Sequence, residues 1–145
     1  MYQRILLAYD GSSSGQKALL ESKVFAQWAK ASISLLAVIP VSPPVFAPET
    51  GFYDKDEALH ENQYYQEVLK NGIDFFSAFG LQVKGDIATG DPVTEIVRYA
   101  EKLDADLVIV GHKHQSSWVG RWWGGQVSKS LIEHSPCNVL VVVSP

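Results

Sequence analysis

The chain alternates between short, almost continuously apolar runs and segments in which apolar residues recur every three or four positions. Four apolar runs cover 4–9, 33–39, 107–110 and 138–143, and a weaker one covers 81–87. Continuous apolar runs of this length are typical of strands that are buried on both faces, as in parallel sheets. The pattern therefore predicts five strands.

Four helices are predicted between these strands. Small and apolar residues form one stripe over 18–29, and apolar residues spaced by four and three positions form a second stripe over 65–79. Asp91 and Pro92 have the residue types of a helix N-cap and a first helical position, so a third helix begins there. A fourth helix covers about 125–134.

The order of these elements defines the fold class. Strands that alternate with helices predict an α/β protein with an open parallel five-stranded sheet and helices on both faces. The length of 145 residues allows one domain, which we expect to span 1–145. One irregular segment, 40–55, holds four prolines and is interpreted as a mobile flap near the edge of the sheet, with disorder as the alternative.

Composition narrows the function classes. The formal net charge of −4 argues against a nucleic-acid-binding protein. No apolar run approaches the ~20 residues that span a bilayer, and the N-terminal residues lack the pattern of a signal peptide. Cys137 is the only cysteine, which excludes a disulfide within the chain. We therefore expect a cytoplasmic protein without a membrane span and without a nucleic-acid partner.

Polar residues follow the first predicted strand at its carboxyl end, where open α/β sheets bind their ligands. Asp10 and Gly11 are followed there by a run of serines. In the preferred interpretation Ser12 or Ser13 caps the next helix, and the helix dipole favours the carboxylate of Asp10. In the alternative interpretation Asp10 accepts a hydrogen bond from a hydroxyl or amine of a ligand.

A second candidate site follows the fourth predicted strand. Gly111 begins a loop that ends at the pair Gly124 and Gly125, and this pair opens a helix whose N-terminus favours anions. The segment 113–129 has three cations and no carboxylate, which suits a small anion, although a solvated loop is an alternative. The three cations are Lys113, Arg121 and Lys129.

Three tryptophans, Trp118, Trp122 and Trp123, lie in the same loop. Tryptophan is enriched where proteins bind partners, so the loop is interpreted either as a surface for a protein partner or as a hydrophobic lid. His112 and His114 do not predict a zinc site, because no cysteine or carboxylate completes a set at ligand spacing.

Three blocks of the sequence resemble the universal stress protein family. They are RILLAYDGS near the start, GDPVTEIVRYAEKLDADLVIVG in the middle and VSKSLIEHSPCNVLVVV near the end. The resemblance implies the strand order 3-2-1-4-5, an architecture similar to the adenine nucleotide alpha hydrolases. It also implies a homodimer that pairs through the last strand, which begins at Asn138 and ends at Val143. Some members of the family bind ATP and others do not.

The ATP-binding members share a glycine motif that this sequence retains only in part. The motif is Gly, two residues, Gly, nine residues, Gly and then Ser or Thr. His114 stands at the second glycine, and either Gly125 or Gln126 stands at the Ser or Thr position, depending on the alignment. Matched by position, the nucleotide-binding residues would be Ala8, Asp10, Val38, Gly111, His114, Gly124, Gly125, Gln126, Val127 and Ser128.

These observations predict a small dimeric stress-response regulator with a weak site for ATP or another adenine nucleotide. No metal is expected beyond magnesium carried by the nucleotide. The first alternative is an interaction module that works through the tryptophan loop without a nucleotide. A slow ATP hydrolase is the other alternative, but 111–128 contains no Asp or Glu to hold a metal near the phosphates.

Overall fold

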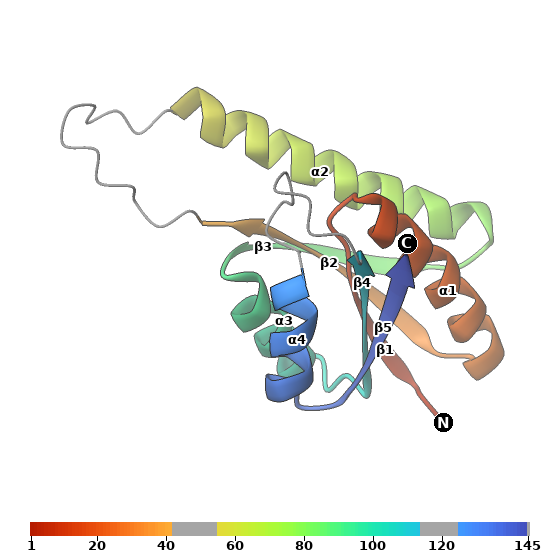
Figure 1. Cartoon of the computed structure of the whole chain (residues 1–145). Coiled ribbons are helices and arrows are strands. Elements are labelled where there is room, and N and C mark those ends of the chain that lie inside the picture. Colours follow the sequence, from red (N-terminus) through yellow and green to blue (C-terminus); the bar gives the residue numbers. More distant parts are fainter. Residues whose placement is uncertain (42–54, 114–124, 145) are drawn as a thin grey trace.

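Five parallel strands form one sheet in the order β3-β2-β1-β4-β5 (Figure 1). The structure is a computed structural model that describes residues 1–41, 55–113 and 125–144. The strands are β1 (Arg4–Ala8), β2 (Ser32–Pro40), β3 (Val83–Gly90), β4 (Leu107–Lys113) and β5 (Asn138–Ser144). The predicted fold class and strand order are confirmed.

Two helices cover each face of this sheet (Figure 1). Helices α1 (Ser13–Ala29) and α2 (Lys55–Ala78) pack on one face, and α3 (Pro92–Lys102) and α4 (Gly125–His134) pack on the other. The side chains of successive residues in β1 point to alternate faces of the sheet. Leu7 packs under α1 and α2, and Leu6 packs under α3 and α4. Each is at most 1% exposed, so the central strands are buried on both sides as predicted.

Local capping explains where α3 begins. The N–H of Thr94 donates to Oδ2 of Asp91 at 3.0 Å, and Pro92 occupies the first turn, where its missing N–H has no cost. The predicted N-cap is therefore confirmed. No helix among residues 1–41, 55–113 and 125–144 is long and apolar enough to cross a membrane.

Two strands differ from their predicted bounds by more than one residue at an end. The strand predicted over 81–87 lies at Val83–Gly90, at an edge of the sheet where it pairs with β2 alone. The strand predicted to end at Val110 continues to Lys113, because Gly111 and the two residues after it pair with the last residues of β5. Backbone pairing extends this strand past the end of its apolar run.

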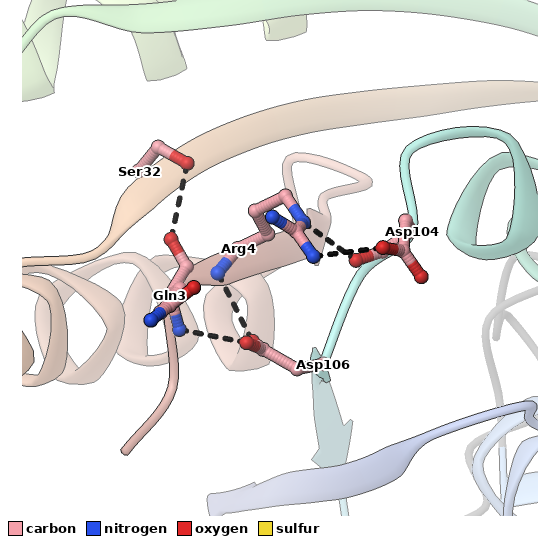
Figure 2. A network of polar contacts seen from close by, with 5 residues as sticks. All are labelled: Gln3, Arg4, Ser32, Asp104 and Asp106. Atoms are coloured by element: carbon pink, nitrogen blue, oxygen red, sulfur yellow. Dashed lines mark hydrogen bonds and ion pairs between the residues drawn. The ribbon is translucent and has the colours of Figure 1, made fainter.

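A polar network joins the amino ends of the strands (Figure 2). The carboxylate of Asp106 accepts hydrogen bonds from the backbone N–H groups of Gln3 and Arg4, at 2.8 and 3.0 Å. The guanidinium of Arg4 forms an ion pair of 2.8 Å with Asp104. Because these groups are exposed, the ion pair contributes little stability, and the main effect of the network is to fix β1 beside the start of β4. A cavity of about 590 Å³ opens beside Arg4 and Ser32, at the end of the sheet away from the crevice described next.

Candidate functional site

The strand order reverses at the centre of the sheet. Strand β1 lies between β2, to which the chain runs through α1, and β4, which the chain reaches only after β3. The helices that follow β1 and β4 therefore leave towards opposite faces, and the carboxyl ends of these two strands border a crevice. The polar residues after β1 and the strand order both indicate a ligand site at the carboxyl end of the sheet.

Asp10 lies in this crevice, two residues past the end of β1, and is 8% exposed. Its Oδ1 atom accepts hydrogen bonds from the backbone N–H and the hydroxyl of Ser12, at 2.9 and 2.6 Å. The hydroxyl oxygen of Ser12 in turn accepts from the N–H of Gly15 at 3.1 Å, so the predicted capping of α1 is confirmed for Ser12. The other carboxylate oxygen, Oδ2, accepts no hydrogen bond from the described residues, which leaves an acceptor for a further donor.

Two tyrosines, Tyr9 and Tyr64, lie next to Asp10. Tyr9 is 2% exposed, and its hydroxyl oxygen accepts a hydrogen bond from the side-chain amide of Gln16. Burial, with a smaller contribution from the charge of Asp10, raises the pKa of Tyr9 to about 12. The hydroxyl of Tyr64 donates to the backbone carbonyl of Asp10 at 3.3 Å. Tyr9 is therefore neutral at physiological pH, and its hydroxyl is joined to α1 through Gln16.

At Val38 only the backbone groups, and not the side chain, can contact a ligand in the crevice. The isopropyl group is fully buried in the core under α3 and α4. Ala8 ends β1 opposite Leu36, whose carbonyl accepts from the N–H of Tyr9 at 2.9 Å, and β2 then continues to Pro40. Backbone groups alternate along a strand, so the N–H and C=O of Val38 point to the same side as the carbonyl of Leu36. That side is the space beyond the end of β1.

The absence of a side chain at Gly111 has a packing cause. A Cβ atom added there would lie 2.5 Å from the carbonyl oxygen of Ser14 and 2.9 Å from the backbone nitrogen of Gly15. The first turn of α1 therefore rests directly on β4. Glycine was expected here so that a ligand could approach the backbone, and the structure shows that a helix occupies the space on this side.

A histidine joins β4 to the first turns of α4. The Nδ1 atom of His112 lies 3.3 Å from the hydroxyl oxygen of Ser128, which is 4% exposed. Val127 is 5% exposed and packs into the core. The structure thus brings Ser128 to the carboxyl end of β4, with Val127 beside it in the core. His112 was not among the predicted site residues, although its position directly after Gly111 was a signal for it.

Several predicted residues lie outside the described part of the chain. These are His114, Gly124 and Arg121, together with the three tryptophans and most of the predicted flap. Gly125 and Gln126 form the first two positions of α4. Lys129 is exposed on the same helix. In the segments that the structure describes, no group of three or more His, Cys, Asp or Glu residues gathers to hold a metal ion.

The described crevice can hold a ligand through three kinds of group. One carboxylate oxygen of Asp10 can accept from a hydroxyl. The backbone of Val38 can donate to and accept from a planar heterocycle. The first turn of α4 presents backbone N–H groups that suit an anion. This combination fits a ligand with a base, a hydroxylated sugar and a phosphate.

Comparison with known proteins identifies one family throughout. The family model described as "Universal stress protein family" matches residues 1–143. A universal stress protein of Methanocaldococcus jannaschii is 30% identical over 145 residues, which cover 100% of this chain and 84% of the relative. A universal stress protein of Bacillus subtilis is 28% identical over 148 residues, covering 98% of this chain and 99% of the relative.

Solved structures share the fold at lower identity. The universal stress protein UspA from Lactobacillus plantarum superposes with a TM-score of 0.77 at 23% identity, over 97% of each chain. A universal stress protein in complex with cAMP gives a TM-score of 0.70 at 24% identity, over 97% of each chain. A family protein from Arabidopsis thaliana with AMP bound gives a TM-score of 0.70 at 20% identity, over 99% of this chain and 92% of that one.

Proposed function

This chain belongs to the universal stress protein family, and on this basis we propose that it is a cytoplasmic stress-response regulator that binds an adenine nucleotide weakly. The nucleotide occupies the crevice at the carboxyl ends of β1 and β4. Two proteins with the same fold hold AMP or cAMP, which supports an adenine nucleotide as the ligand class.

The observation that carries the proposal is the carboxylate of Asp10. It is almost fully buried, one of its oxygens is occupied by Ser12, and the other accepts nothing from the described residues. A ribose hydroxyl that donates to this oxygen forms a charge-assisted hydrogen bond, which is about twice as strong as a neutral one. The edge of the adenine ring then meets the N–H and C=O of Val38, beyond the end of β1.

The phosphate side of the site is weaker. The N-terminal turn of α4 supplies backbone N–H groups and the positive end of the helix dipole. However, His114 replaces a glycine of the family motif, and Gly125 or Gln126 replaces a hydroxyl residue. Each missing phosphate hydrogen bond costs about 1.5–3 kcal/mol, so affinity falls by one to a few orders of magnitude relative to relatives with the full motif.

Binding without turnover fits these residues better than hydrolysis. An ATP hydrolase needs acidic residues that hold a metal beside the phosphates, and the segment 111–128 contains no Asp or Glu. Tyr9, the ionisable side chain next to Asp10, stays protonated up to about pH 12. We therefore assign the crevice a sensing role, in which nucleotide occupancy changes the state of the protein.

We also propose that the protein is a homodimer formed by antiparallel pairing of β5. This strand pairs with β4 on one side only, and five of its seven residues are Val or Leu. An apolar strand at the edge of a sheet exposes unpaired backbone groups and is an aggregation hazard unless it is covered. Pairing with a second copy satisfies those groups.

Isothermal titration calorimetry with adenosine, AMP and ATP tests the nucleotide site. We expect binding of AMP and ATP that weakens at least tenfold in Asp10→Asn, which keeps the size of the side chain and removes its charge. Asp91→Asn is the matched control, because Asp91 caps α3 as part of a separate element. Unchanged affinity in Asp10→Asn, or no heat with any of the three compounds, would contradict the proposal.

A further inference from the structure

An open cavity at the amino end of the sheet is lined by aromatic rings. It has a volume of about 530 Å³ and lies where the end of α1 meets the N-terminal segment and the start of β5. Three rings line it, those of Tyr2, Phe25 and Trp28. Its volume lies within the range of about 300–1,000 Å³ that is usual for small-molecule sites.

The three rings meet at angles instead of stacking. The centroids of Tyr2 and Phe25 lie 5.8 Å apart with 47° between the ring planes, and those of Phe25 and Trp28 lie 5.9 Å apart with 73° between the planes. Phe25 is therefore the middle wall of the cavity. Tyr2 is held in place because its hydroxyl oxygen accepts a hydrogen bond of 2.9 Å from the side-chain amide of Asn138. Trp28 is 67% exposed, so its ring is accessible to a ligand.

A carboxylate gives this cavity a negative charge. Among the described residues that line it, only Asp106 has a charged side chain. The face of an aromatic ring is also electron-rich and attracts a positive charge placed over it. Three rings beside one carboxylate therefore favour a cation over an anion or an uncharged ligand.

The hydrogen bonds inside the protein narrow the kind of cation. The two carboxylate oxygens of Asp106 already accept from the backbone N–H groups of Gln3 and Arg4 (Figure 2), and the hydroxyl oxygen of Tyr2 accepts from Asn138. A primary ammonium carries three N–H donors and is strongly hydrated, so it would give up water for acceptors that are already engaged. A trimethylammonium group has no N–H donor, and its methyl groups can contact the ring faces directly.

We propose that this cavity is a binding site for a trimethylammonium group, as in choline. The three rings contact the methyl groups, and the carboxylate of Asp106 balances the charge. The cavity lies at the amino end of the sheet, whereas the nucleotide crevice lies at the carboxyl end, so the inference goes beyond the proposed function. The same group occurs in free compounds and in the headgroup of phosphatidylcholine, and the cavity recognises the chemistry that the two share.

Calorimetry with choline and with 3,3-dimethyl-1-butanol tests whether the cavity recognises the charge. The second compound has the shape of choline with a carbon atom in place of the charged nitrogen. We expect choline to bind about tenfold more tightly, because only choline gains from the rings and the carboxylate as a cation. Asp106→Asn keeps the size of the side chain and removes its charge. It should weaken the binding of choline and leave the binding of the uncharged compound unaffected.

Trp28→Leu removes a ring and keeps an apolar side chain, so it should weaken the binding of choline about tenfold. Phe79→Leu is the matched control, because Phe79 is a 48% exposed ring directly after α2 whose centroid already lies 3.5 Å from the ammonium of Lys23. Nuclear magnetic resonance then locates the site. Of the four tryptophan indole N–H signals, the one that Trp28→Leu removes should shift most when choline is added.

Three results would overturn the proposal: no binding of choline, equal affinity for choline and its uncharged analogue, or unchanged affinity in Trp28→Leu. If choline binds as expected, cosedimentation with phosphatidylcholine vesicles distinguishes the two sources of the group. Capture by the vesicles indicates a lipid headgroup, and its absence indicates a free compound, and both results uphold the cavity as the site. These experiments contain no nucleotide, so their outcome is separate from that of the crevice.

Discussion

The carbonyl oxygen of Ser14 lies 2.5 Å from the point that a Cβ atom on residue 111 would occupy. Real Cβ atoms do not approach a backbone oxygen this closely, so α1 can rest on β4 only because residue 111 is glycine. The same glycine stands at the start of the family's nucleotide motif. The packing of α1 on β4 therefore requires glycine at position 111, whether or not a ligand binds.

Gly111→Ala should destabilise the protein by about 1–3 kcal/mol, the usual cost of overpacking a well-packed site. The atoms that it would meet belong to the backbone of α1 and cannot turn away. Gly85→Ala is the comparison, because the nearest atoms there are side-chain ends of Ile73 and Leu69, which can adjust. Urea unfolding curves measure both, and an equal or smaller loss for Gly111→Ala would contradict the packing argument.

The N-cap of α1 gives a second stability prediction. Ser12→Ala removes the acceptor of the Gly15 N–H and one donor to Asp10, and should lower the free energy of unfolding by about 1 kcal/mol. Ser13→Ala, at the exposed next position, should change it by less than about 0.5 kcal/mol. Similar losses in the two variants would mean that Ser12 does not act as the cap.

The fold could be predicted from the sequence because its strands are continuous apolar runs. The 33–39 run lies in β2 and the 138–143 run lies in β5 with one added residue. The prediction was least accurate for the edge strand β3, because its residues mostly alternate between half-buried and exposed positions and include Lys84 and Asp86. An apolar run marks burial, and an edge strand is buried only in part.

The contacts of the crevice could not be predicted in the same way. Capping by Ser12 is local and was predicted from residue type. The approach of Ser14 to Gly111 joins residues 97 positions apart. The pairing of His112 with Ser128 likewise depends on how α4 returns to β4. Sequence spacing carries no record of such distances, so the packing of α1 on Gly111 could not be predicted.

Tyr9 gives the protein a specific sensitivity to alkaline pH. Its pKa is about 12 in the folded protein, against about 10 for an ordinary tyrosine. Below pH 10 both states keep the proton, and the stabilising effect of the buried neutral phenol is complete. Between pH 10 and 12 the unfolded chain loses the proton and the folded chain keeps it, so the free energy of unfolding falls as pH rises.

Tyr9→Phe should therefore lose stability more gradually than the wild type between pH 10 and 12, whatever its stability at neutral pH. Thermal melts at closely spaced pH values measure the slope. Tyr2→Phe is the control, because Tyr2 is only half-buried and lies at the opposite end of the sheet. Identical slopes for Tyr9→Phe and the wild type would show that Tyr9 ionises at its ordinary pKa.

The last prediction concerns how salt affects the binding of three ligands that differ only in phosphate number. Adenosine should bind with an affinity that barely changes between 50 and 500 mM NaCl, because the contacts proposed for it are hydrogen bonds to Asp10 and to the backbone at Val38. In the proposed site the phosphates of AMP and ATP lie at the first turn of α4, and Lys129 is an exposed cation directly after that turn. Exposed charges on flexible side chains are screened by salt, so the affinity for ATP should fall the most. Lys129→Gln should flatten the salt dependence for ATP and leave adenosine unaffected, whereas Lys102→Gln, an exposed cation at the far end of α3, should change neither. Calorimetry at four salt concentrations gives the slopes, and tight ATP binding that is insensitive to salt would mean that preformed backbone amides, as in the complete glycine motif, hold the phosphates.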